Sequence, residues 1–103
     1  MPQLRFNDEI YTSTVDTTGE VIIFETGESA QVAMRIRNCE TSGGQLLIGV
    51  NIALGSLSAT LCDEALDPGE WAEIACTPND VVRWKASTGN IDATARRIVR
   101  EGY

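Results

Sequence analysis

The alternation of apolar and polar residues in short segments constrains this sequence more than any other feature. Segment 29–38, SAQVAMRIRN, shows it clearly: the apolar residues Val32, Met34 and Ile36 are separated by Ala33 and Arg35. A period of two places successive side chains on opposite faces of an extended chain, which predicts a strand with one buried face. No segment has a sustained helical period, so the crossover helices of a parallel βαβ fold are not predicted. The sequence therefore favours an all-β protein with antiparallel strands.

Turn residues at regular intervals separate the predicted strands. Besides segment 29–38, the predicted strands are 20–25, 45–54, 71–76, 81–87 and 91–99, with a weaker candidate at 57–62. Asp67-Pro68-Gly69 has proline at the first central position of a turn and glycine at the second. Residues 88–90, TGN, are predicted to form a tight hairpin loop. Seven or eight short strands with this spacing predict an antiparallel β-sandwich or a jelly-roll-like barrel.

The length and the N-terminal composition define the expected domain organisation. The chain has 103 residues, which suits one domain with a modest core. We assign residues 20–103 to a single β-sandwich domain. Residues 1–19 are polar and rich in threonine, and they are predicted to form an extended N-terminal arm with one short strand. Such segments are often ordered only by a neighbour, so the arm is expected to take part in subunit contacts.

The composition argues against catalysis and against cofactor binding. The chain contains no histidine, which excludes Ser-His-Asp and Cys-His arrangements. Cys39, Cys62 and Cys76 form no C-x-x-C pair, and no histidine is present to complete a zinc site. Their odd number argues against a disulfide framework. The acidic residues between 63 and 73 lack the spacing of a calcium loop. We therefore expect no enzymatic activity, no cofactor and no bound metal.

The charge balance narrows the range of partners. The formal net charge is −7, with 15 acidic and 8 basic residues. Nucleic-acid binding requires clustered basic residues, and the sequence offers one such cluster, formed by Arg96, Arg97 and Arg100. No apolar run approaches the roughly 20 residues of a membrane helix, and the N-terminal residues lack the pattern of a signal peptide. We expect no nucleic-acid partner, no membrane partner and assembly in the cytoplasm.

The candidate interface combines apolar residues that the alternation directs outward with two apolar residues of the N-terminal arm. The pattern places Trp84 in the core but turns large apolar residues of several strands away from it, which indicates a two-sided sheet or a subunit interface. Gly49, within segment 45–54, predicts a bulge or a close approach of the backbone. An exposed Trp71 is also typical of a carbohydrate-binding module, in which it would stack on a sugar. The candidate interface residues are Leu47, Trp71, Val81, Ile10 and Tyr11.

The order of turns and strands resembles that of small β-sandwich proteins of tailed-bacteriophage particles. In those proteins a first turn opens a long strand that ends in N-T-S, and an L-x-P-G-E turn, an A-S-T turn and a last strand near A-T follow. The matching positions here are Thr26-Gly27-Glu28, Asn38 to Ser42, Leu66 to Glu70, Asn79 to Val82, Ala86 to Thr88 and Ala93-Thr94. The resemblance covers about residues 20 to 99. Proline is missing from the first turn, and the chain ends in ATARRIVREGY rather than in a glycine-containing strand.

The resemblance implies a non-enzymatic structural protein of the virion. Its members decorate capsids or belong to the head–tail junction, the tail or the fibres. For this chain the resemblance implies a capsid decoration protein that bridges subunits of the major capsid protein. It also implies self-association, with a trimer favoured, and assembly in the cytoplasm of the bacterial host. A neck, tail or fibre component is one alternative, and a carbohydrate-binding β-sandwich module is another.

Overall fold

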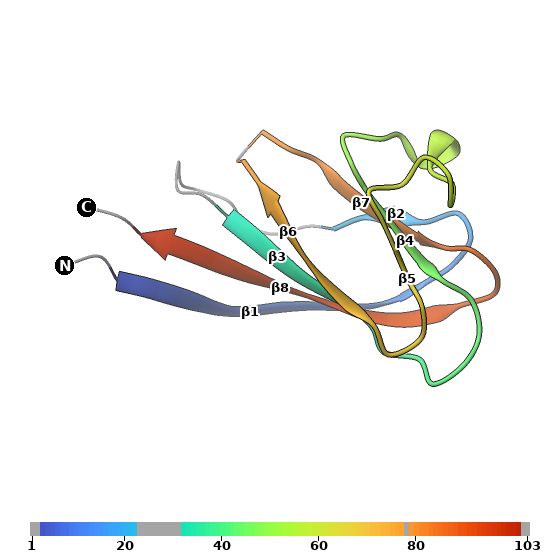
Figure 1. Cartoon of the computed structure of the whole chain (residues 1–103), viewed down its shortest axis with the longest axis horizontal. Coiled ribbons are helices and arrows are strands. Elements are labelled where there is room, and N and C mark those ends of the chain that lie inside the picture. The colour runs from blue at the N-terminus through green and yellow to red at the C-terminus, as the bar shows by residue number, and fades with distance from the viewer. Residues whose placement is uncertain (1–2, 23–31, 78, 102–103) are drawn as a thin grey trace.

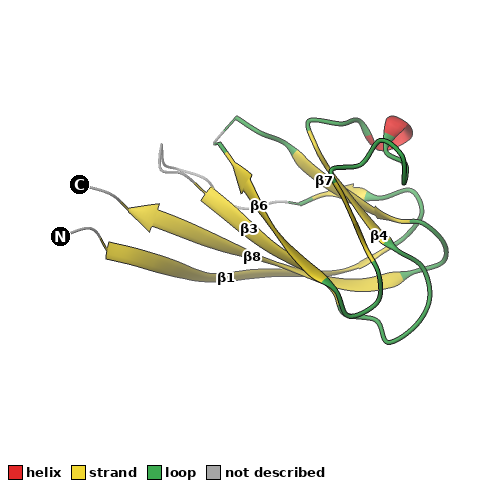
Figure 2. Ribbon diagram, in the orientation of Figure 1, coloured by secondary structure: helices red, strands yellow, loops and turns green. Residues whose placement is uncertain are grey.

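Eight strands and one 3₁₀ turn make up the computed structural model, which describes residues 3–22, 32–77 and 79–101 (Figure 1). Sheet A has the strand order β1-β8-β3-β6 and sheet B has the order β2-β7-β4-β5, and every pairing is antiparallel. In chain order the elements are β1 (Gln3–Val15), β2 (Glu20–Val21), β3 (Val32–Asn38), β4 (Leu46–Val50), η1 (Leu54–Ser56), β5 (Glu64–Leu66), β6 (Trp71–Cys76), β7 (Val82–Ala86) and β8 (Ile91–Glu101). The two sheets pack face to face (Figure 2), which confirms the predicted all-β antiparallel sandwich. Within the described residues, no helix has the length and apolar character needed to cross a membrane.

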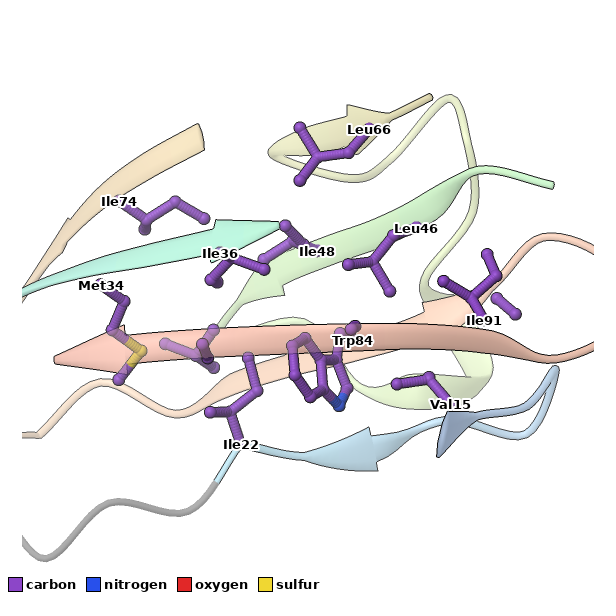
Figure 3. Close-up of a cluster of buried hydrophobic side chains, with 14 of the residues drawn as sticks. Val15, Ile22, Met34, Ile36, Leu46, Ile48, Leu66, Ile74, Trp84 and Ile91 are labelled. Carbon is purple, nitrogen blue, oxygen red and sulfur yellow. The ribbon is translucent and has the colours of Figure 1, made fainter. Parts of the chain in front are cut away.

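The core lies between the two sheets, and the predicted alternation supplies it. Met34 and Ile36 of β3 point inward while Arg35 and Arg37 are exposed. Trp84 of β7 is fully buried at the centre of the cluster in Figure 3. Its indole Nε1 donates a hydrogen bond of 3.2 Å to the Glu20 carboxylate, so the polar atom of the ring is satisfied at the edge of the core.

The N-terminal segment is more regular than the sequence indicates. The short strand expected within the arm at residues 1–19 is instead the 13-residue strand β1, which pairs with β8 from Gln3↔Glu101 to Val15↔Ile91. The register shifts between Phe6 and Ile10. Val15 is buried in the core, so this segment belongs to the sandwich rather than lying apart from it as an arm.

Two local predictions are wrong, and one is only partly visible. Residues 88–90 form a turn but not a hairpin, because β7 belongs to sheet B and β8 to sheet A. Segment 57–62 is a turn that follows η1 and not a strand, since Cys62 N–H donates to the Ser58 carbonyl at 2.8 Å. Of the predicted strand 20–25, β2 covers Glu20–Val21, and residues 23–25 lie outside the described residues.

The expectation that Leu47 is exposed is wrong. Leu47 lies on the outer face of sheet B but is only 3% exposed, because residues 51–58 lie against that face. Gly49 makes this packing possible, because a Cβ there would lie 2.8 Å from Leu57 Cδ1. The close approach predicted at Gly49 is therefore one between its backbone and the side chain of Leu57. The Arg83 guanidinium donates to the Ile52 carbonyl at 3.0 Å and ties the segment down.

The predicted turn at Asp67-Pro68-Gly69 is confirmed. Glu70 N–H donates to the Asp67 carbonyl at 2.9 Å, and Gly69 has φ +83°, as a type II turn requires at this position. The Glu70 carboxylate accepts a hydrogen bond of 2.8 Å from Asp67 N–H and closes the turn. This turn leads the chain from β5 in sheet B to β6 in sheet A, and so it delivers Trp71 to the sheet A edge.

Candidate functional site: the outer face of sheet A

The outer face of sheet A carries a depression of about 390 Å³, which we call the Trp–Arg groove. Its lining comes from all four strands of the sheet: Ile10 from β1, Thr94 and Arg96 from β8, Arg35 and Arg37 from β3, and Trp71 from β6. The register of β3 brings these residues together. Arg37 lies opposite Trp71 on one side and Thr94 on the other, and Arg35 lies opposite Arg96.

The floor of the groove combines an aromatic ring with a guanidinium group. Trp71 is 56% exposed, although large aromatic side chains are usually buried. The Arg35 guanidinium lies over its ring at 4.8 Å from the centroid, a cation–π contact that holds both side chains in place. Ile10, 57% exposed, adds an apolar surface at the β1 side of the groove. An exposed apolar surface beside fixed cations is well suited to a partner that carries apolar and acidic groups.

The groove is cationic in a chain that is strongly acidic overall. Three of the 8 basic residues line it, against a formal net charge of −7. Arg35 and Arg96 are cross-strand neighbours, and like charges directly opposite one another are unfavourable in a sheet. Glu73 lies opposite Arg35 on β6 and offsets part of this charge. Three arginines on one face therefore favour an anionic partner.

The cysteines differ in their access to this site. Cys39 is exposed, and its Sγ lies 3.6 Å from the Thr94 hydroxyl, so it borders the groove. Cys62 is half-buried and precedes the acidic residues Asp63 and Glu64 in the chain. Cys76 is buried, and burial raises the pKa of its thiol, with Asp80 adding to the rise. Within the described residues, no three His, Cys, Asp or Glu side chains come together as a metal site.

The five predicted interface residues fall into different environments. Trp71 and Ile10 are exposed and line the groove. Tyr11 points the other way, packs against the core, and places its ring 5.8 Å from that of Trp84. Val81 is exposed just before β7 and does not line the groove, and Leu47 is buried on the outer face of sheet B.

The arginines of the groove were missed because the sequence shows them on separate segments. The predicted basic cluster does not form on one face: Arg96 lines the groove, whereas Arg97 is buried on the inner face of β8. The side chain of Arg100 lies outside the described residues. Alternation already directs Arg35 and Arg37 outward. This outward direction, together with the pairing of β3 with β6, is the information that would have located the site.

No protein-family model matches this chain, and no curated protein matches it. Among solved structures, it is similar to a chain of the Bacillus endospore appendages, which are described as a novel family of disulfide-linked pili. The TM-score is 0.63 at 13% sequence identity, and the match covers 97% of this chain and 88% of that chain. At this identity the likeness shows a shared β-sandwich fold over nearly the whole of both chains.

Proposed function

We propose that this protein is a non-enzymatic structural subunit that works in a multi-copy assembly. The Trp–Arg groove carries this proposal, because it places an exposed tryptophan, an exposed isoleucine and three arginines on one face. Tryptophan and arginine are among the residues enriched in protein–protein contacts and in their energetic centres. The sequence contains no histidine, so the face lacks the usual general base of an active site.

The finer proposal is a capsid decoration protein of a tailed bacteriophage, assembled in the host cytoplasm and bound to the major capsid protein as a trimer. The order of turns supports it, since Leu66 to Glu70 forms the L-x-P-G-E turn and Asn38, at the N-T-S position, is a buried hydrogen-bonded residue. A decoration protein acts by mass action. It binds the assembled lattice and not the dissociated subunits, and so stabilises the lattice by RT ln(1 + [L]/Kd).

Two measurements test the decoration proposal. Immunogold labelling of intact particles with antibody against this chain is expected to mark the head surface. Titration of the protein onto undecorated heads is expected to raise their melting temperature, by an amount that grows with free concentration. Label confined to the neck or tail would move the protein to that part of the virion. Particles without label, from a lysate that contains the protein, would contradict an exposed virion role.

A fibre subunit is the second candidate, and the structural likeness favours it. The similar chain belongs to appendages described as disulfide-linked pili, and the likeness covers 97% of the present chain. Cys39 is exposed beside the groove, where a neighbouring subunit would contact it. Electron microscopy of the purified protein after oxidation, with a non-reducing gel, tests this candidate. Filaments that shorten on reduction would support it, and unlinked particles of uniform size would contradict it.

The groove is less suited to the carbohydrate-binding alternative. A sugar ring would stack on the face of Trp71, and the Arg35 guanidinium already lies over that ring.

A further inference from the structure

We propose that the Trp–Arg groove of one copy binds an acidic tip on a different surface of a second copy, in a head-to-tail contact. The acidic tip is formed by Leu61, Asp63 and Glu64, in the turn between η1 and β5 and at the start of β5. This inference rests on the proposed structural function and names the surfaces through which the copies associate.

The acidic tip is a fixed projection with an apolar end. Leu61 is 61% exposed, and its N–H donates to the Ser58 carbonyl at 3.1 Å. Asp63 N–H donates to the Ile48 carbonyl at 2.9 Å, and the Asp63 carboxylate accepts from Val50 N–H at 2.6 Å. These bonds anchor the tip to β4, so little conformational entropy is lost when it binds.

The acidic tip and the groove lie on separate surfaces of the sandwich, since no residue of the tip lines the groove. The groove occupies the outer face of sheet A. The chain that leads to the tip, residues 51–58, lies against the outer face of sheet B, where Leu57 packs on Gly49 and Lys85 Nζ donates to the Leu54 carbonyl at 3.2 Å. One copy can therefore present its tip to a second copy while its own groove remains open to a third.

The two surfaces are complementary in chemistry. The groove offers Trp71 and Ile10 with three arginines around them, and the tip offers Leu61 with the carboxylates of Asp63 and Glu64 two and three residues after it. Leucine against an indole and an isoleucine buries apolar area, and arginine is the side chain best suited to bind a carboxylate with two parallel hydrogen bonds. Glu64 is exposed on an edge strand, where a neighbouring chain can reach it.

The same charges disfavour a symmetric contact. A twofold dimer through the groove would place the arginines of both copies together, and one through the tip would bring carboxylates together. A contact between unlike surfaces avoids both. The rotation that relates one copy to the next decides which assembly forms. A rotation that closes gives a ring, such as the proposed trimer, and one that does not close gives a filament.

Complementary variants test the contact. The groove variant carries Arg35→Gln and Arg37→Gln, and the tip variant carries Leu61→Ser and Glu64→Gln. All four wild-type residues are exposed, so both variants are expected to keep the wild-type circular dichroism and melting temperature. Val21→Ser, at an exposed apolar residue of β2, and Ser42→Lys, at an exposed residue of the β3–β4 loop, are the matched controls.

Sedimentation equilibrium of the full chain over about 10 to 500 μM gives the readout. Wild type and both controls are expected to associate, with weaker association when the salt is raised from roughly 50 to 500 mM. Each variant alone is expected to associate at least about tenfold more weakly. An equimolar mixture of the two is expected to form a 1:1 dimer of twice the 11.2 kDa chain mass and to stop there, because the intact tip of one fits the intact groove of the other.

A wild-type protein that stays monomeric over this range would overturn the head-to-tail contact. So would two variants that associate as wild type does, or a mixture that yields no dimer. These results bear on the proposed trimer but not on the structural function itself, because a decoration protein can bind a lattice as a monomer. That function is tested separately by binding of the monomeric protein to undecorated heads.

Discussion

Replacement of Asn38 by alanine is expected to destabilise the fold more than any other single change to a polar side chain at this end of the sandwich. Asn38 ends β3 and is 0% exposed. Its Nδ2 donates to the Leu66 carbonyl at 3.0 Å and to the Gly44 carbonyl at 3.2 Å, and its Oδ1 accepts from Glu40 N–H at 3.1 Å. One side chain thus connects β3 to the β3–β4 loop and to the end of β5.

The size of the expected loss of stability follows from the groups that lose a hydrogen-bond partner. The bond to the Leu66 carbonyl is buried, and leaving a buried acceptor unsatisfied costs about 1–3 kcal/mol. The bonds to Gly44 and Glu40 are partly buried, so water replaces them in part and each costs less. We expect Asn38→Ala to lower the free energy of unfolding by about 2–4 kcal/mol, a large share of the total of about 5–15 kcal/mol for a typical domain.

Asn38→Asp separates the loss of hydrogen bonds from the loss of volume. It keeps the shape but replaces the donor with a charged oxygen that faces two carbonyl groups, so the folded state raises the pKa of the new carboxyl group. A raised pKa means that the variant loses no stability from ionisation below the unfolded pKa of about 3.9 and loses stability as the pH rises through the folded value. At pH 7 this variant is therefore expected to be less stable than Asn38→Ala.

Urea unfolding at pH 7 and at pH 4, followed by the fluorescence of the buried Trp84, measures these differences. Asn90→Ala, at an exposed residue of the turn between β7 and β8, is the control and is expected to change stability by less than about 0.5 kcal/mol. A cost of less than about 1 kcal/mol for Asn38→Ala would refute the role given to these hydrogen bonds. So would an Asn38→Asp variant that is no less stable than Asn38→Ala at pH 7.

Three other perturbations probe separate parts of the sandwich. Gly49→Ala forces a Cβ to within 2.8 Å of Leu57 Cδ1, so it is expected to lower the urea midpoint by the equivalent of about 1–3 kcal/mol, and an unchanged midpoint would contradict this packing. The Thr18 hydroxyl, followed by the Gly19 amide, lowers the pKa of the Asp16 carboxyl group. The stability advantage of wild type over Asp16→Ala is therefore full above the unfolded pKa of about 3.9 and lost as the pH falls through the folded value, which unfolding at graded pH measures. A thiol reagent is expected to modify exposed Cys39 in the native protein but buried Cys76 only on unfolding, as peptide mapping after brief labelling would show.

Local features of the fold could be predicted because local chemistry decides them. The inward positions of β6 and β7 follow from alternation, and the turn at Asp67-Pro68-Gly69 follows from the fixed φ of proline and the positive φ open to glycine. Strand pairing could not be predicted in the same way. The turn at 88–90 has hairpin chemistry, yet β7 and β8 enter different sheets, because burying both apolar faces against one another outweighs the pairing of consecutive strands.

Only part of the candidate site could be predicted from the sequence. Alternation correctly turns Trp71 outward, and it does the same for Arg35 and Arg37. It cannot place β3 between β6 and β8, which is the step that joins these residues to Arg96. The predicted exposure of Leu47 is wrong for a different reason. Alternation correctly places Leu47 on the outer face, but the segment after β4 covers that face, and the sequence of the strand alone gives no sign of this.

The two faces of sheet A separate folding from the proposed association. β8 gives small buried residues, Ala93 and Ala95, to the cluster around Trp84, and it gives Thr94 and Arg96 to the groove from the opposite face. β3 likewise buries Ile36 and exposes Arg37. Because successive residues alternate between these environments, the groove can change its charge without changing the core volume. Substitutions on the outer face are therefore expected to alter association with little effect on unfolding, and substitutions on the inner face the reverse.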